Sequence, residues 1–195
     1  MKDSFIFLAD GFEEIEALTV IDVLRRADIP ARTISITSSR QVTGAHGVNV
    51  TADCIYDSTL FGNVEWLILP GGMPGATNLY EFDPLKGLLK HHVENRGQVA
   101  AICAAPAVVL GQLGLLKGKK ATCYPGFEQL CEGAEMIDSP VVKYENFVLG
   151  NGPANALLWA LEIVRQQKGD LVATQIANGM LLYPRSEEDT DFYFG

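Results

Sequence analysis

The stretch from Val99 to Ala107 joins a short apolar strand directly to a helix. Val99-Ala100-Ala101-Ile102 is typical of a buried strand, and the residues from Ala104 to Leu113 favour a helix, with Cys103 at the junction. The first turn of a helix has free amide donors and the positive end of the helix dipole, so it stabilises an anion. We therefore expect Cys103 to have a lowered pKa and to be the nucleophile of a strand-turn-helix elbow. The alternative is that Cys103 is a core residue.

Segments that favour strands and helices alternate along the rest of the chain. Strands are predicted at 4–9, 31–36, 66–69, 99–102 and 120–123 and in a hairpin over 141–149, and helices at 13–27, 83–94, 104–113, 126–131, 155–167 and 171–177. This alternation predicts an α/β fold with a mostly parallel central sheet and helices on both faces. Ligands of such sheets bind at the carboxyl ends of the strands. The loops that are expected to converge there lie at 10–14, 71–76, 103 and 124–126.

The composition predicts a single domain over residues 1–195. The chain is 48% hydrophobic, and it contains no repeat, low-complexity segment or linker that would divide it. A net charge of -9 argues against nucleic acid or an anionic membrane as the main partner. No apolar run is long enough to span a bilayer, so a cytoplasmic location is expected. In a reducing compartment, the four cysteines at 54, 103, 123 and 131 are expected to be free thiols.

Two features near Cys103 are candidates for its partners. Glu16 lies about one turn into the first predicted helix, and a carboxyl held against a thiolate is expected to have a raised pKa and to stay protonated. Glu13 and Glu14 are instead expected on a solvated face. The glycine-rich turn over 69–76 directly follows a buried strand and could present backbone amides to an oxyanion, although a plain tight turn has the same composition.

Histidine is scarce in this chain. His91 and His92 are expected on the surface of a helix, whereas His46 lies in a loop and could reach the site. No histidine follows Cys103, which excludes a Cys-His dyad with the histidine downstream. No spacing of Cys, His and carboxylates suggests a metal site.

Five segments together resemble the ThiJ/PfpI superfamily, and most closely its branch of the Parkinson-disease-linked deglycase and peroxide sensor. They are ADGFEEIE (9–16), LPGGMPGATNL (69–79), AICAAPAVVL (101–110), ATCYPGFE (121–128) and GNGPANAL (150–157). The resemblance implies a flavodoxin-like three-layer sandwich, usually a homodimer, with a reactive Cys103, a protonated Glu16 and an oxyanion site at Gly72. In the enzyme mechanism that we expect, the amide of Ala104, the residue after Cys103, would help to hold the oxyanion. No cofactor is implied.

The chain departs from this family at several positions. Tyr124 stands where the branch often has a histidine, and tyrosine is a poor base near neutral pH, so acid–base chemistry is expected to fall to Glu16. Asn151 and His46 replace arginines of some relatives and are possible pocket residues. Ala104 replaces the histidine of the peptidase branch, which makes a protease an unfavourable interpretation. A glutamine amidotransferase is equally unfavourable without a downstream histidine.

Two functions use the same residues. The first is a cofactor-independent enzyme of the glyoxalase or deglycase type, in which Cys103 attacks a small reactive aldehyde. The alternative is a peroxide sensor in which Cys103 oxidises to a sulfinate; a chaperone is the third possibility. The acidic and aromatic tail over 187–195 has no assigned role.

Overall fold

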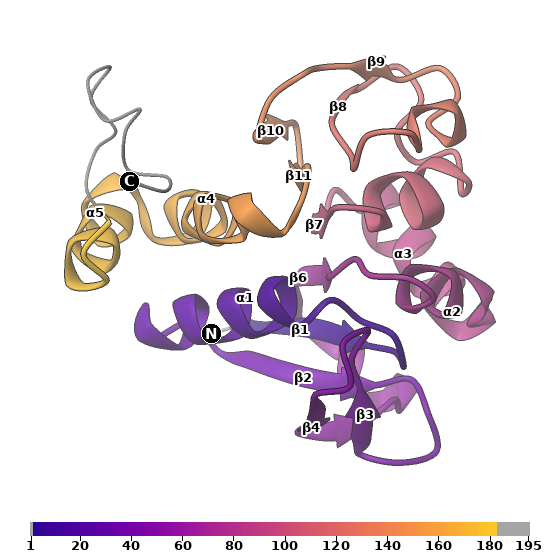
Figure 1. Cartoon of the computed structure of the whole chain (residues 1–195), viewed down its shortest axis with the longest axis horizontal. Coiled ribbons are helices and arrows are strands. Elements are labelled where there is room, and N and C mark those ends of the chain that lie inside the picture. Colours follow the sequence, from indigo (N-terminus) through magenta and orange to yellow (C-terminus); the bar gives the residue numbers. More distant parts are fainter. Residues whose placement is uncertain (1, 183–195) are drawn as a thin grey trace.

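A seven-stranded sheet forms the centre of the computed structural model, which describes residues 2–182 (Figure 1). From edge to edge, the strands are β10 (Val141–Tyr144), β11 (Phe147–Gly150), β7 (Gln98–Ile102), β6 (Val64–Leu69), β1 (Asp3–Leu8), β2 (Ala31–Ser35) and β5 (Cys54–Ile55). Neighbouring strands pair in parallel except β10, which is antiparallel to β11. The predicted mostly parallel sheet is confirmed.

Helices cover both faces of this sheet. α1 (Glu14–Arg26), α4 (Ala156–Lys168) and α5 (Asp170–Gly179) lie on one side, and α2 (Gly75–Glu81) and α3 (Asp83–Glu94) lie on the other (Figure 1). Successive residues of β1 enter different layers: Ile6 and Leu8 join one apolar cluster, while Phe5 and Phe7 join the other. Both faces are therefore buried, which explains why this strand is a continuous apolar run. The predicted three-layer flavodoxin-like fold is confirmed.

Helix α1 begins in a way that fixes the position of Glu16. The side chain of Glu13 caps the helix, because its carboxylate accepts a hydrogen bond from the amide of Glu16 at 2.8 Å. The first turn is acidic and the last turn is basic, as the helix dipole favours. Glu16 consequently lies one turn into the helix, next to the carboxyl ends of the central strands.

Three segments differ from the sequence prediction. The strand expected at 120–123 forms only as β8 (Lys120–Ala121), which pairs with β9 (Glu135–Met136) outside the central sheet. It ends early because the chain turns toward the elbow, where the amide of Tyr124 donates to the carbonyl of Cys103 at 2.8 Å. The helix expected at 104–113 contains a π-helical segment, Pro106–Gly111. The helix expected at 126–131 is also different, because only a 3-10 turn forms there, at Glu128–Leu130.

The remaining elements are short. β3 (Gln41–Thr43) and β4 (Asn49–Thr51) form a separate antiparallel pair, and 3-10 turns lie at Ser58–Gly62, Glu128–Leu130 and Pro153–Asn155. The tail over 187–195 lies outside the described residues. Among residues 2–182, every helix is too short or too polar to cross a lipid bilayer.

Candidate active site

Cys103 directly follows β7 and adopts a strained backbone conformation. Its φ of +64° is in the left-handed region, which costs a non-glycine residue about 1–3 kcal/mol. Two backbone hydrogen bonds hold this geometry: the Cys103 amide donates to the Gly150 carbonyl at 3.0 Å, and the Cys103 carbonyl accepts from Tyr124. The side chain is 8% exposed. This sharp, anchored turn has the backbone geometry of a nucleophile elbow.

Glu16 is the carboxyl that meets this thiol. It is fully buried, and its Oε2 accepts a hydrogen bond from the amide of Gly71 at 2.7 Å. Its Oε1 is buried without a close hydrogen-bond partner, and the Cys103 thiol is the side chain that interacts with the carboxyl. Burial raises the pKa of Glu16 to about 7, although the hydrogen bond from the Gly71 amide and the neighbouring Cys103 thiol oppose this. Glu16 can therefore both give and accept a proton near neutral pH.

The lowered pKa expected for Cys103 is wrong. Burial and the negative charge of Glu16 raise the pKa of the thiol to about 12, and the hydrogen bonds from the amides of Gly72 and Ala104 offset only part of this. A helix N-terminus stabilises a thiolate, but here desolvation and a neighbouring carboxylate outweigh it. Cys103 thus needs a base in order to attack, and Glu16 is in the position to be that base.

The glycine-rich turn after β6 brings these groups together. A side chain at Gly72, which has a φ of +88°, would lie 2.4 Å from the backbone nitrogen of Glu13. At Gly71, a Cβ atom would lie 2.7 Å from the Cβ of Cys103 and 2.9 Å from Oε2 of Glu16. Both positions therefore require glycine. The sequence prediction named Gly72 but missed Gly71, whose only sequence signal was its place in the Gly-Gly pair.

The ionisation of Glu16 should affect the reactivity of the Cys103 thiol. The proton that leaves near pH 7 comes from Glu16, whose pKa is about 7, and the resulting carboxylate helps to hold the pKa of Cys103 at about 12. We therefore expect alkylation of Cys103 by iodoacetamide to be slow between about pH 7 and about pH 9 and to keep rising toward the pKa of the thiol, about 12. Alkylation that levels off above about pH 8.5, the ordinary pKa of a cysteine thiol, would contradict the raised pKa.

The solvated face expected for Glu13 and Glu14 is also wrong. Both residues are buried, with 8% and 6% exposure. Glu14 accepts hydrogen bonds from the backbone of His46 at 2.6 Å and from its ring Nδ1 at 2.8 Å, and Oε1 of Glu13 lies 4.0 Å from the same ring nitrogen. The fold of β3 and β4 brings His46 to the start of α1, which the local sequence does not show.

These three residues also revise the expectation about metals. The donor atoms of Glu13, Glu14 and His46 lie within 4.8 Å of one another, so they could hold a cation. The carboxylate of Glu14 and the ring of His46 already satisfy each other, and this pairing raises the pKa of His46. Within residues 2–182, no hydrogen bond joins His46 to Cys103 or Glu16.

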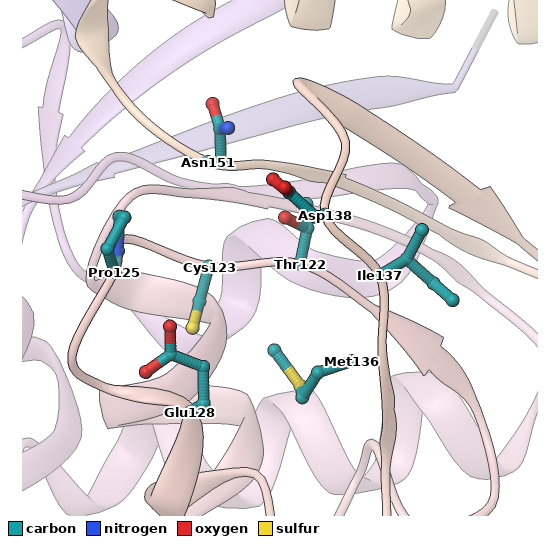
Figure 2. Close-up of a pocket in the computed structure, with 8 residues that line it drawn as sticks. All are labelled: Thr122, Cys123, Pro125, Glu128, Met136, Ile137, Asp138 and Asn151. Carbon is teal, nitrogen blue, oxygen red and sulfur yellow. The ribbon is translucent and has the colours of Figure 1, made fainter.

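Tyr124 and Asn151 have different positions relative to the elbow. Tyr124 is bonded to Cys103 through its backbone, and its half-exposed ring lies beside Phe127 and Gly152. Asn151 instead lines a separate cavity that includes Cys123 (Figure 2). The structure thus brings Glu16, Gly72, Ala104 and the backbone of Tyr124 to Cys103, and leaves Asn151 in the neighbouring cavity.

A flavodoxin-like sandwich with a thiol and a buried carboxyl at a strand-to-helix elbow defines the class of this protein. The chain belongs to the DJ-1/PfpI family, whose model matches residues 2–166. It is 31% identical over 171 residues to "Glutathione-independent glyoxalase DJR-1.2" of Caenorhabditis elegans, covering 86% of this chain and 90% of that protein. The structure of oxidized DJ-1 from Toxoplasma gondii superposes with a TM-score of 0.90 at 33% identity, covering 94% of this chain and 100% of that one.

Some relatives are much longer than this chain. "Protein DJ-1 homolog B" of Arabidopsis thaliana is 33% identical over 189 residues, which is 96% of this chain but 43% of that protein. The chain thus spans less than half the length of this relative.

The family and the fold predicted from sequence are confirmed. The homodimer, the absence of nucleic-acid and membrane partners, the cytoplasmic location and the single domain over 1–195 stay predictions.

Proposed function

We propose that the protein is a cofactor-independent thiol enzyme that acts on small reactive aldehydes, with 2-oxoaldehydes as the substrate class. The observation that carries this proposal is the contact between Cys103 and the buried carboxyl of Glu16, whose pKa is raised to about 7. A general base is most effective when its pKa lies near the working pH. A thiol with a pKa of about 12 requires such a base.

The geometry supports addition of the thiol to a carbonyl group. The sulfur of Cys103 forms a bond to the aldehyde carbon as Glu16 takes the thiol proton, and the carbonyl electron pair moves onto oxygen. The amides of Gly72 and Ala104, which hydrogen-bond to the Cys103 sulfur, are available to hold that oxyanion. Glu16 then returns the proton to the oxygen, which gives a neutral hemithioacetal.

A glyoxalase reaction needs two further steps. Glu16 would move a proton from the former aldehyde carbon to the adjacent carbonyl carbon, while the hydroxyl proton of the hemithioacetal passes to the adjacent carbonyl oxygen. The hemithioacetal thereby becomes a thioester of a 2-hydroxy acid. Water would then cleave the thioester, releasing the acid and restoring the thiol. The relative described as a glutathione-independent glyoxalase supports this chemistry, and at 31% identity it supports the reaction class rather than a particular substrate.

A second candidate is hydroperoxide sensing through Cys103. The Toxoplasma gondii relative is described as oxidized. The amides that would hold an oxyanion could equally hold a sulfinate, with protonated Glu16 as an additional donor. The two functions differ in the fate of the thiol, because turnover restores it and oxidation consumes it.

Methylglyoxal consumption by the wild-type protein and by Cys103→Ser, in metal-free buffer, tests the proposal. We expect many turnovers per chain in the wild type and their loss in the serine variant. No turnover, with Cys103 the first thiol to be oxidised by peroxide, would favour the sensor. Equal turnover by both proteins would remove Cys103 from the mechanism and would be the outcome expected for a thiol-independent role.

A further inference from the structure

Three side chains that can ligate a metal converge where α1 begins. Glu13 caps the helix, Glu14 is its first residue, and His46 belongs to the loop that joins β3 to β4 (Figure 1). One donor atom from each residue lies within 4.8 Å of the other two. The carboxylates are buried, whereas the side chain of His46 is 72% exposed, so the cluster opens to solvent on the histidine side.

Each carboxylate is held by one oxygen atom and presents the other to the histidine. Oε2 of Glu13 accepts the hydrogen bond of the Glu16 amide, and its Oε1 lies 4.0 Å from Nδ1 of His46, too far for a hydrogen bond. Oε1 of Glu14 accepts from the backbone amides of His46 and Val48, while its Oε2 lies 2.8 Å from Nδ1. Among residues 2–182, no group donates to Oε1 of Glu13, although this side chain is only 10% exposed. An unpartnered oxygen of a buried carboxylate therefore points into the cluster.

The loop that carries His46 is held in place without the histidine ring. The amide of Ala45 donates to the carbonyl of Phe12 at 2.8 Å, next to the start of α1. A Cβ atom at Gly44 would collide with the carboxylate of Glu14, so glycine at this position allows the loop to approach the helix. The backbone thus positions the histidine opposite both carboxylates before any ligand binds.

The negative charge of the cluster is only partly balanced. Within residues 2–182, His46 is the one basic side chain that forms an ion pair with Glu13 or Glu14. Two buried carboxylates beside a single imidazole leave a net negative charge, which is costly to bury. A divalent cation would neutralise both carboxylates.

The donor atoms and their spacing favour zinc among the divalent cations. Zn²⁺ binds imidazole nitrogen and carboxylate oxygen at about 2.0–2.2 Å in a tetrahedron, which separates its ligand atoms by about 3.4 Å. The separations from Nδ1 of His46, 2.8 Å to Glu14 and 4.0 Å to Glu13, lie on either side of this value. Ca²⁺ and Mg²⁺ instead require about six or more oxygen ligands. A nitrogen donor with two carboxylates is therefore a set for zinc rather than for these ions.

We propose that Glu13, Glu14 and His46 form a binding site for one divalent cation of the zinc type. Oε1 of Glu13, Oε2 of Glu14 and Nδ1 of His46 coordinate the ion, and water takes the fourth position. As the ion binds, the proton between Nδ1 and Glu14 leaves, and Nε2 carries the proton of the neutral ring. The ion links the loop between β3 and β4 to the start of α1 and so stabilises the folded chain. It lies beside the glycine-rich turn, because the Glu13 amide donates to the Gly71 carbonyl at 3.0 Å.

Calorimetric titration of the metal-free full chain with zinc chloride tests this proposal. The Cys103→Ala background is used throughout, so that the elbow thiol cannot supply a ligand. We expect one Zn²⁺ per chain, and an affinity at least about tenfold weaker when His46→Ala is added. This change removes an exposed ring and keeps the backbone amide that Glu14 accepts, so the variant should fold. His91→Ala, which removes an exposed histidine on α3, is the matched control and should bind like the background protein.

Two further measurements locate the ion. Glu13→Gln keeps an oxygen for the Glu16 amide but loses the charge, and it should weaken zinc binding by at least about tenfold as well. Saturating zinc should raise the midpoint of thermal unfolding in the background protein and in His91→Ala, but not in His46→Ala. The absorption spectrum of the Co²⁺-loaded protein should lack a thiolate-to-metal band, because no ligand of this site is a cysteine.

Three outcomes would overturn the proposal. They are the absence of zinc binding, equal zinc affinity in His46→Ala and the background protein, and a thiolate-to-metal band in the cobalt spectrum. All of these measurements use a chain that lacks the Cys103 thiol and none depends on aldehyde turnover, so this proposal and the proposed function can fail separately.

Discussion

Glu16→Gln is expected to lose aldehyde turnover by about 10²–10⁴-fold while Cys103 stays reactive toward iodoacetamide. Glutamine keeps a neutral hydrogen-bonding group at the same place but cannot accept the thiol proton. It also removes the charge that helps to raise the pKa of Cys103, so thiolate should form at least as easily as in the wild type. Methylglyoxal consumption and alkylation rates, measured on the same preparation at pH 8, would show this split.

Two further variants serve as controls for this result. Glu162→Gln makes the same chemical change on α4, where Glu162 pairs with Arg165 on the surface, and should leave both rates unchanged. Glu16→Asp keeps the charge but withdraws the carboxylate by one methylene. Its turnover should therefore be slower than that of the wild type and faster than that of Glu16→Gln. If Glu16→Gln retained turnover, Glu16 would not be the base.

Gly71→Ala is expected to abolish turnover and, in contrast to Glu16→Gln, to slow alkylation of Cys103 as well. The new methyl group would lie 2.7 Å from the Cβ of Cys103, 2.8 Å from the carbonyl oxygen of Ile102 and 2.9 Å from Oε2 of Glu16. None of these groups can yield easily, because Ile102 belongs to a central strand and Glu16 is fully buried. Overpacking of this kind costs about 1–3 kcal/mol of the free energy of unfolding.

The matched variant is Gly87→Ala on α3. A Cβ atom there meets nothing within 4 Å, and the position is exposed and helical. Alanine is favoured over glycine in a helix by about 1 kcal/mol, so this variant should be slightly more stable and fully active. Denaturant unfolding and turnover measured side by side would separate the two glycines. Wild-type activity in Gly71→Ala would show that the contact between Cys103 and Glu16 tolerates displacement.

Local patterns of apolar residues predicted the fold, and the structure has the strands and helices that these patterns indicate. The apolar run ending at Leu69 and the small residues before Cys103 are buried strands because both faces of a parallel sheet are covered. The helix over 83–94 has the bounds that Pro84 and its apolar stripe indicate. The strand at 120–123 was harder to predict, because its partners depend on the tertiary path of the chain. It pairs with β9 and then turns to Cys103.

Residue identity and spacing thus determined the alternation of strands and helices and the elbow at Cys103. They also indicated that Glu16 and Gly72 would lie near Cys103 at the carboxyl ends of the strands. Only the tertiary structure decided the protonation of these groups and the partners of the others. The raised pKa of Cys103 and the burial of Glu13 and Glu14 depend on desolvation and on which segments, far apart in the chain, lie side by side. Periodicity reports which face of an element is buried, but it carries no information about which charge or thiol lies opposite.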